Sequence, residues 1–187
     1  AVQHPPLGTA LAVLAAADAL EGFDGDVLVA FADTPLVSLA TYRRLIERRR
    51  ADDDPAVVVL GFRPADPAAY GRLVVRKGRL KRIVEAADAD EDELAIGLCN
   101  AGLMALDGKR ALELLRGIGF GTAVVEADED EVMGINSRAE LARAESIWQR
   151  RRRRRAMDEG VTLVDPDTVF FGADTVLGRD VTIGPNV

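Results

Sequence analysis

The chain has 187 residues, of which 48% are hydrophobic, so it can bury the core of one ordinary domain, or of one domain and part of another. Its formal net charge of −7 argues against nucleic acid as the main partner, because proteins that bind DNA or RNA usually carry an excess of Lys and Arg. No apolar stretch reaches the roughly 20 residues of a membrane-spanning helix, and the single cysteine, Cys99, has no partner for an internal disulfide. We therefore expect a globular, cytoplasmic protein with no membrane partner.

The first elements, in chain order, predict a β-α-β unit. Residues 27–31 and 56–62 are continuous apolar runs of strand length, which is typical of buried parallel strands. Residues 39–50 between them have helical spacing and a charged outer face. Asp33 follows the first strand, so polar groups are expected at the carboxyl end of that strand.

The next elements complete the predicted sheet. Apolar and basic side chains alternate over residues 72–85 around Lys77-Gly78, which predicts a β-hairpin. The remaining elements are expected to be a buried strand within 95–106, a helix over 109–116 and a strand over 122–127.

A long helix follows the predicted sheet. Ser137-Arg138-Ala139-Glu140 is a capping-box sequence, and helical spacing continues from it toward Met157. Residues 150–155 are six consecutive arginines, which indicate either RNA or acidic-lipid binding, or a solvated helix between domains. We favour the solvated helix, because six successive positions point all around a helix and cannot form one face.

Beyond Gly160 the sequence repeats every six residues. The repeats are Phe171-Gly172, Leu177-Gly178 and Ile183-Gly184, with Asp174, Asp180 and Asn186 three residues after the apolar positions. A fixed period of six is the signature of a parallel β-helix, whereas the alternative is a Gly-rich loop that repeats by chance. A β-helix would point the three apolar side chains inward.

Several short motifs along the whole chain carry a family resemblance by their order and spacing. They are Gln3 with Leu7-Gly8-Thr9, Phe31-Ala32-Asp33-Thr34-Pro35-Leu36, Tyr70-Gly71-Arg72, Ile83-Val84-Glu85, Asn100-Ala101-Gly102 and Gly134-Ile135-Asn136-Ser137-Arg138. With the α/β pattern, the long helix and the hexapeptide repeats, they resemble the bacterial bifunctional N-acetylglucosamine-1-phosphate uridyltransferase/glucosamine-1-phosphate N-acetyltransferase.

This resemblance implies an α/β fold in three parts. Residues 1–136 would form part of a Rossmann-like nucleotidyltransferase (pyrophosphorylase) domain on a mixed, mostly parallel sheet. Residues 137–159 would be a linker helix, and residues 160–187 the first coils of a left-handed parallel β-helix. Because the chain opens at Ala1 and stops within a repeat, we expect it to be a segment of a longer protein, which would be a homotrimer as in the family.

The resemblance also implies an enzyme of UDP-N-acetylglucosamine biosynthesis, and hence of peptidoglycan and lipopolysaccharide synthesis. It would use Mg²⁺ to transfer a uridylyl group from UTP to N-acetylglucosamine-1-phosphate, giving UDP-N-acetylglucosamine and pyrophosphate. An acetyl-CoA-dependent acetyltransferase would belong to the longer protein only. The family's Gly-rich, Lys-containing nucleotide loop precedes Ala1, so we expect the segment alone to have little or no uridyltransferase activity.

By the same resemblance, Asp33 and Asn136 hold the metal, and Asn136 also contacts substrate. Mg²⁺ commonly takes one or two protein oxygens and completes its octahedron with phosphate oxygens and water, so this pair suffices. The alternatives are a turn or cap role for Asp33 and a helix-start role for Asn136.

Gln3 matches the residue that reads uracil in the family, since its amide both donates and accepts hydrogen bonds. Gly8 would let the backbone approach the base, and Thr9 would add a hydroxyl at the start of a helix. Simple helix capping is the alternative for Gly8 and Thr9.

Three further positions match those that contact the N-acetylglucosamine moiety. They are Gly71 through its backbone amide, Glu85 through its carboxylate and Asn100 through its side-chain amide. Tyr70 and Arg72 are interpreted as flanking structure.

One departure from the family leaves other functions open. The family has a sugar-contacting segment between the helix and strand that match 109–116 and 122–127, whereas here Phe120 runs directly into Gly121. The alternatives are another sugar-1-phosphate nucleotidyltransferase, for example one that uses glucose-1-phosphate, and a non-catalytic trimeric module that binds nucleotide sugars.

Overall fold

The structure is a computed structural model that describes residues 13–67, 69–115 and 121–187. The chain divides into two compact units, Ala1–Val132 (unit 1) and Met133–Val187 (unit 2). Within the described residues, none of the helices is both long enough and apolar enough to cross a lipid bilayer.

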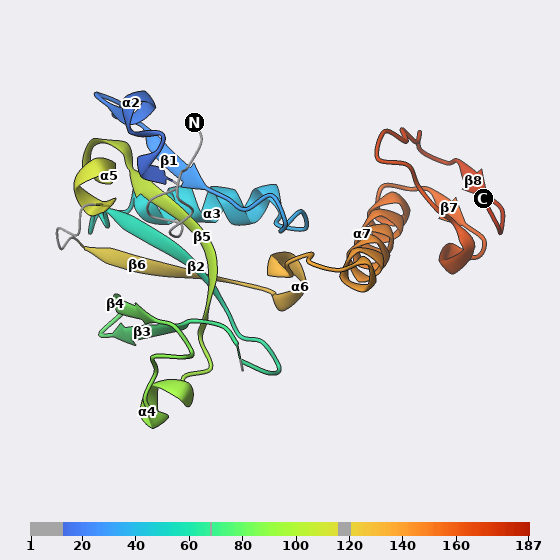
Figure 1. Cartoon of the computed structure of the whole chain (residues 1–187). Helices are drawn as coiled ribbons and strands as arrows, with labels where there is room; N and C mark the ends of the chain where they lie inside the picture. Colours follow the sequence, from blue (N-terminus) through green and yellow to red (C-terminus); the bar gives the residue numbers. More distant parts are fainter. Residues whose placement is uncertain (1–12, 68, 116–120) are drawn as a thin grey trace. The chain divides into compact units, whose positions relative to one another are not determined.

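Unit 1 is a mixed α/β unit (Figure 1). Its elements are α2 (Ala17–Leu20), β1 (Asp26–Val29), α3 (Leu39–Arg49), β2 (Val57–Phe62), β3 (Arg72–Arg76), β4 (Arg79–Val84), α4 (Glu91–Leu94), β5 (Cys99–Asp107), α5 (Gly108–Leu115), β6 (Thr122–Ala127) and α6 (Glu129–Val132). The predicted order of strands and helices is confirmed over the described residues.

The described strands of unit 1 form one mixed sheet. Its order is β4-β3-β5-β2-β6, and β1 pairs with β5. Strands β1, β2 and β3 are antiparallel to β5, and β6 is parallel to β2. Four strands therefore share one direction, while β4 and β5 run the other way, and β2–β6 is the parallel pair of neighbours. The predicted β-α-β unit is present as β1-α3-β2, with β5 lying between its two strands.

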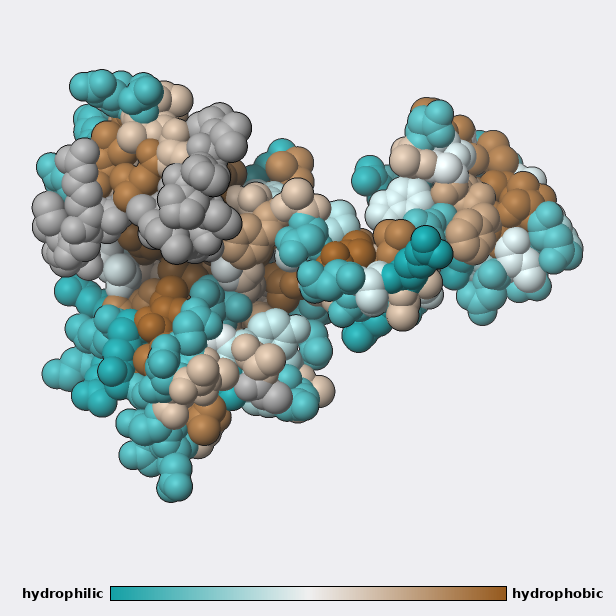
Figure 2. All heavy atoms as spheres, viewed as in Figure 1, coloured by the Kyte–Doolittle hydropathy of each residue, from teal (hydrophilic) through white to brown (hydrophobic). Residues whose placement is uncertain are grey.

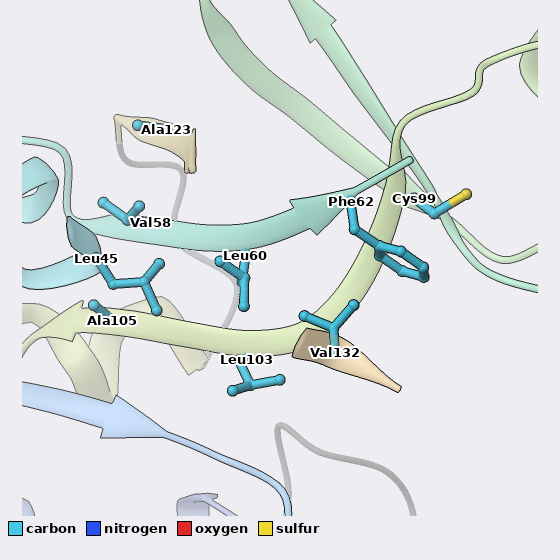
Figure 3. Close-up of a cluster of buried hydrophobic side chains, with 9 residues drawn as sticks. All are labelled: Leu45, Val58, Leu60, Phe62, Cys99, Leu103, Ala105, Ala123 and Val132. Carbon is cyan, nitrogen blue, oxygen red and sulfur yellow. The ribbon is translucent and has the colours of Figure 1, made fainter. Parts of the chain in front are cut away.

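Strand β2 supplies side chains to two cores, because successive residues of a strand point to opposite faces. On one face, Leu45 of α3 packs with alternate residues of β2 (Figure 3). That cluster comprises Leu45, Val58, Leu60, Phe62, Cys99, Leu103, Ala105, Ala123 and Val132. On the other face, Val59 packs with Leu73 and Leu80 of the hairpin and with Leu98. One face of β2 is thus covered by α3, and the other packs against the β3–β4 hairpin, which joins the sheet through the pairing of Arg72 with Cys99.

The hairpin turns where the sequence predicts. Lys77 and Gly78 both have positive φ, 52° and 73°, as a two-residue turn between right-twisted strands requires. The exposed side chains of β4 are Arg79, Lys81, Arg82 and Ile83, three of which are basic, and Figure 2 shows a largely hydrophilic surface around β4 and α4.

Two predicted strands have different limits in the structure. The run 27–31 forms a strand only as Asp26–Val29, and Leu28 is 39% exposed, so the expectation of a fully buried strand is wrong here. The chain leaves the sheet after Val29 because Phe31 takes part in a turn with Thr34. The strand expected within 95–106 begins only at Cys99, since helix α4 and the residues after it precede it.

Unit 2 begins with the long helix α7 (Arg138–Asp158), as predicted from the capping sequence. The Glu140 N–H donates to the Ser137 hydroxyl at 3.2 Å, so Ser137 is the N-cap. The Glu140 carboxylate in turn accepts from the Asn136 N–H at 2.7 Å. These two bonds satisfy backbone donors that the first turn of a helix leaves free.

The remainder of unit 2 is a coil that packs on α7. Its elements are β7 (Thr162–Leu163), the 3₁₀ helix η1 (Pro166–Thr168) and β8 (Thr182–Ile183). β7 and β8 pair in parallel, with Leu163 opposite Ile183. Phe171 is buried, and Leu177 and Ile183 pack against the same cluster, so the three hexad positions share one interior. The assignment to a left-handed β-helix, and the domain limits at 136 and 159, stay predictions.

Candidate functional site

The candidate site lies at one edge of the sheet of unit 1. Strands β2 and β6 end at Phe62 and Ala127, which pair with each other, and Phe62 also pairs with Cys99 at the start of β5. Residues that follow the carboxyl ends of β2 and β6, and those that open β5, therefore gather at this edge. In open α/β sheets, ligands bind outside the carboxyl ends of the strands.

Strand β5 bulges beside Asn100. Gly61 pairs with Asn100 and Val59 with Met104, so β5 has two more residues than β2 between these pairs. Gly102 lies in the bulge with φ 79°, and its N–H donates to Asn100 Oδ1 at 2.9 Å. Because Oδ1 is used in this way, Asn100 keeps Nδ2 for donation to another group. Bulges of this kind often direct a side chain next to a functional site.

The loop that carries Asp33 packs on this bulge. A Cβ atom at Gly102 would overlap the Phe31 ring, so the aromatic ring lies directly on the glycine. The Thr34 hydroxyl and N–H both donate to the Phe31 carbonyl oxygen, at 3.0 and 3.4 Å. Asp33 lies within this closed turn and is exposed. Its carboxylate has no hydrogen-bond or ion-pair partner among the described residues.

Gly71 and Glu85 adjoin Asn100. The Asn100 N–H donates to the Gly71 carbonyl oxygen at 2.8 Å. A Cβ atom at Gly71 would lie 3.3 Å from Glu85 Oε2, so the carboxylate lies against the glycine backbone. Glu85 is exposed, whereas Gly71 is buried. The structure therefore brings together Gly71, Glu85 and Asn100, which the sequence separates.

The other residues predicted for the site are placed as follows. Gln3, Gly8 and Thr9 lie outside the described residues. Asn136 belongs to unit 2, where its side chain is exposed. Ser137, not Asn136, caps helix α7, so the side-chain amide of Asn136 is not used to cap the helix.

The donor chemistry at Asp33 suits Mg²⁺, which prefers carboxylate oxygens and needs few protein ligands. The carboxylate is exposed, lies in a turn closed by Thr34 and is unpaired within the described part of the chain. No group of three or more His, Cys, Asp or Glu side chains able to hold a metal occurs among those residues. Asp33 therefore fits a site whose other ligands come largely from phosphate and water, rather than a cage built from protein alone.

Sequence reasoning missed two features of this edge. It did not predict the bulge, although a glycine within an apolar strand is a recognised signal for one. It also gave no sign that Arg72, interpreted as flanking structure, is buried, with only 2% of the residue exposed. Nothing in the alternating pattern of the hairpin marks this arginine as different from its exposed basic neighbours.

Cys99 behaves as the small buried residue expected of it. Burial raises the pKa of its thiol, and the nearby charges of Arg72 and Arg63 offset only part of that rise. The thiol thus stays protonated at neutral pH, which disfavours nucleophilic chemistry.

A polar pocket of about 360 Å³ lies beside the end of β6. Its arginines are already engaged: Arg63 Nε pairs with a Glu126 carboxylate oxygen at 3.0 Å, and Arg44 donates to the Glu126 carbonyl at 3.0 Å. Asp128 and Glu129 add further negative charge to its walls, so the pocket has no surplus of positive charge for an anion.

Two solved structures with a similar fold are complexes with nucleotides. A CMP:2-keto-3-deoxy-manno-octonic acid synthetase complexed with CTP matches 72% of this chain and 66% of its own with a TM-score of 0.56 and 12% identity. HddC from Yersinia pseudotuberculosis, complexed with GMP-PN, matches 79% of this chain and 65% of its own with a TM-score of 0.55 and 20% identity. At these identities the likeness establishes the nucleotidyltransferase-like fold alone.

Sequence comparison gives closer relatives, although no family model matches the chain. The bifunctional protein GlmU of Rhodopseudomonas palustris (strain BisA53) is 51% identical over 207 residues, covering all of this chain and 45% of the relative. GlmU of Rhodospirillum rubrum is 50% identical over 202 residues, covering 97% of this chain and 45% of the relative. The match of 207 residues exceeds the 187 of this chain, so the relative has residues in the matched region without a counterpart here.

The chain spans about half the length of the curated relatives that it matches, and the identity extends over its whole length. By this likeness, and by its nucleotidyltransferase-like fold, the chain belongs to the family of the bifunctional GlmU proteins.

Proposed function

We propose that this chain forms most of a uridyltransferase site that joins UTP and N-acetylglucosamine-1-phosphate into UDP-N-acetylglucosamine and pyrophosphate. The observation that carries the proposal is the contact of Gly71, Glu85 and Asn100 at one sheet edge. These three positions are the ones that the family resemblance assigns to the sugar. Their meeting in the fold supports one shared ligand.

The three groups suit a sugar with an N-acetyl substituent. The Glu85 carboxylate is exposed and accepts hydrogen bonds from hydroxyl groups. Asn100 Nδ2 is left to donate to a carbonyl or hydroxyl oxygen, because Oδ1 accepts from Gly102. A backbone amide at Gly71 adds a second donor without a side chain to exclude the ring.

In the reaction, a phosphate oxygen of the sugar phosphate attacks the α-phosphorus of UTP, and the bond to the β-phosphate oxygen breaks to release pyrophosphate. The sugar phosphate is largely dianionic near neutral pH, so the protein needs mainly to align the two substrates and balance their charge. Sugar contacts from Gly71, Glu85 and Asn100 would fix the attacking oxygen relative to UTP.

We assign Mg²⁺ to Asp33, with Asn136 as its second protein ligand. When bound, the metal would neutralise charge on the phosphates. The exposed carboxylate of Asp33, which has no partner among the described residues, supports the first assignment. The side-chain amide of Asn136, which does not cap helix α7, supports the second. Gln3, Gly8 and Thr9 are assigned to the uracil ring and ribose side of UTP by the resemblance.

The remaining functions belong to a longer protein that would carry this segment. We propose that it is a cytoplasmic homotrimer and that it also uses acetyl-CoA to acetylate glucosamine-1-phosphate. The shared interior of Phe171, Leu177 and Ile183 supports the start of a β-helix on which such a trimer would assemble.

A second candidate is a nucleotidyltransferase for a different sugar phosphate. By the family resemblance, a sugar-contacting segment belongs where Phe120 here runs directly into Gly121. A shorter chain in this region favours a less selective sugar site.

Two measurements test the proposal. Isothermal titration of this chain with UDP-N-acetylglucosamine should show binding, and binding of UDP-glucose should be weaker. Pyrophosphate release should be low for this chain and high for a longer protein that also has the Gly-rich loop.

In that longer protein, Asp33→Ala should lower turnover at least about 10²-fold, as expected when a main electrostatic contact is lost. Asp52→Ala, at an exposed carboxylate elsewhere in unit 1, is the control. Equal turnover in both variants would remove Asp33 from the site.

A further inference from the structure

Arg72 is a buried cation directly beside the candidate sugar site. It opens strand β3, next to Gly71, and pairs in the sheet with Cys99 and Val84. Its side chain is only 2% exposed, and no described carboxylate forms an ion pair with it. Burying a guanidinium without a carboxylate partner costs free energy. The hydrogen bonds that the guanidinium forms are therefore needed to offset that cost.

The guanidinium donates to the loop that precedes Gly71. Arg72 Nη1 donates to the Pro67 carbonyl oxygen at 2.8 Å, and also to the Tyr70 carbonyl oxygen. The Tyr70 N–H in turn donates to the Pro67 carbonyl at 3.1 Å, which closes a tight turn. The Tyr70 ring packs edge-on against Phe62 with ring centroids 4.8 Å apart. The arginine thus binds two carbonyl groups of the segment that precedes Gly71.

One of these bonds acts on the Gly71 amide through the planarity of the peptide group. The carbonyl of Tyr70 and the N–H of Gly71 belong to the same peptide unit, and in a trans peptide they point in opposite directions. A fixed Tyr70 carbonyl thus fixes the direction of the Gly71 N–H. The carbonyl of Gly71 is held on the other side by the Asn100 N–H at 2.8 Å. Both peptide planes that flank Gly71 are consequently held.

We propose that Arg72 is a positioning residue for sugar recognition: it holds the Tyr70–Gly71 peptide so that the Gly71 amide is aimed at the sugar of a nucleotide sugar. This inference rests on the proposed function, since it takes the sugar to lie at Gly71, Glu85 and Asn100. Lys cannot replace Arg fully here, because an ammonium is a point charge without the planar fork of donors.

Two variants test this role, with one matched control. Arg72→Met keeps the length of the side chain and removes its donors, and Arg72→Lys keeps the charge. Arg76→Met is the control, because Arg76 is on the same strand but exposed. Titration calorimetry should be run with UDP-N-acetylglucosamine and with UDP, which lacks the sugar.

For Arg72→Met we expect the Kd for UDP-N-acetylglucosamine to rise about tenfold, as for the loss of one well-placed hydrogen bond, while the Kd for UDP changes less than about twofold. The Kd of Arg72→Lys for UDP-N-acetylglucosamine should lie between those of Arg72→Met and the unaltered chain. Arg76→Met should bind both ligands as the unaltered chain does. An equal loss of both ligands, or no loss of either, would overturn the proposal by reducing Arg72 to a structural role.

A measurement on the unaltered chain keeps the proposal testable even if both variants fail to fold. In a ¹⁵N–¹H spectrum, the Gly71 amide resonance should move on addition of UDP-N-acetylglucosamine and stay in place with UDP. A resonance that moves equally with both ligands, or with neither while the sugar nucleotide binds, would contradict it. Failure of the unaltered chain to bind UDP-N-acetylglucosamine at all would instead count against the proposed function.

Discussion

Gln149 on helix α7 pairs with the backbone of Phe171 as a neighbouring strand would. Gln149 Nε2 donates to the Phe171 carbonyl at 2.8 Å, and the Phe171 N–H donates to Gln149 Oε1 at 2.9 Å. The side chain is 1% exposed, so this amide satisfies two backbone groups that have no access to water. Arg152 adds a cation–π contact, with its guanidinium 5.6 Å from the Phe171 ring centroid.

Gln149→Leu should therefore destabilise unit 2. It leaves a buried N–H and a buried C=O unsatisfied, each at a cost of about 1–3 kcal/mol, so we expect a loss of roughly 2–6 kcal/mol. The single tryptophan, Trp148, packs in the same cluster, so urea unfolding followed by its fluorescence reports on unit 2. Arg154→Ala is the control, because the Arg154 side chain is 82% exposed. An unfolding midpoint unchanged by Gln149→Leu would refute this role.

Gly102→Ala should destabilise unit 1. At φ 79° an alanine is strained by about 1–2 kcal/mol, and its Cβ would overlap the Phe31 ring, so we expect a total cost of roughly 2–4 kcal/mol. Thermal melting followed by circular dichroism measures the loss. Phe31→Ala in the same chain should restore part of it by removing the overlap. If the double variant is no more stable than Gly102→Ala, the ring is not the obstacle.

Gly71→Ala should weaken sugar binding while leaving the fold intact. The backbone of Gly71 does not have positive φ, but a Cβ there would lie only 3.3 Å from Glu85 Oε2 and would displace the carboxylate. We expect about tenfold weaker binding of UDP-N-acetylglucosamine by calorimetry, with an unchanged melting temperature. Gly97→Ala is the matched control, because its Cβ would make an ordinary 3.7 Å contact with Arg63. Equal binding by both variants would separate Gly71 from the sugar.

A cluster of ion pairs makes unit 1 sensitive to acid. Burial alone would raise the pKa of Asp107, but the hydrogen bond and charge of Arg110 outweigh it, and the pKa lies below the ordinary 3.8. Arg49 pairs with the same carboxylate at 3.2 Å and also with Asp26. A carboxyl group whose pKa is lowered by folding stabilises the fold above its unfolded pKa, and this contribution is lost as the pH falls through the folded value.

Melting temperatures of unit 1 should accordingly decrease as the pH falls below about 4. Asp107→Asn should lower the melting temperature at pH 7 and flatten its dependence on acid pH. Asp52→Asn, at an exposed position that takes part in none of the ion pairs formed by the described residues, should follow the unaltered chain. A steep acid dependence that persists in Asp107→Asn would place its cause in other groups.

Local signals were sufficient for much of the fold. The hairpin turn at Lys77-Gly78, the helix that starts after Ser38 and the capping of α7 by Ser137 were predictable because each depends on neighbouring residues. The strand Thr122–Ala127 has the bounds predicted for it, since an apolar run flanked by polar residues marks its own ends.

Features that depend on distant contacts were not predictable in this way. Beyond the end of β1, the Phe31 ring packs on Gly102, a contact with a residue far along the chain that the local sequence does not indicate. The run of arginines on α7 was expected to be solvated, yet Arg152 and Arg153 donate to carbonyls of the coil, at Thr175 and Val169. The burial of Arg72 likewise goes with its hydrogen bonds to the Pro67 and Tyr70 carbonyl oxygens, which the alternating pattern of the hairpin does not predict.

Strand β5 lies between β1 and β2, and this has a consequence for how the chain acquires its fold. β1 ends at Val29 and β2 at Phe62, but the strand that joins them begins only at Cys99. During synthesis from the amino end, the first two strands thus remain unjoined, and the apolar edge of β2 stays uncovered until β5 has left the ribosome. Strands that are far apart in the sequence pair slowly. Until they pair, their unpaired edges are exposed and prone to aggregation. The turn after β1 that carries Asp33, the proposed metal ligand, and the bulge of β5 beside Asn100, a proposed sugar contact, therefore come together in the same late step.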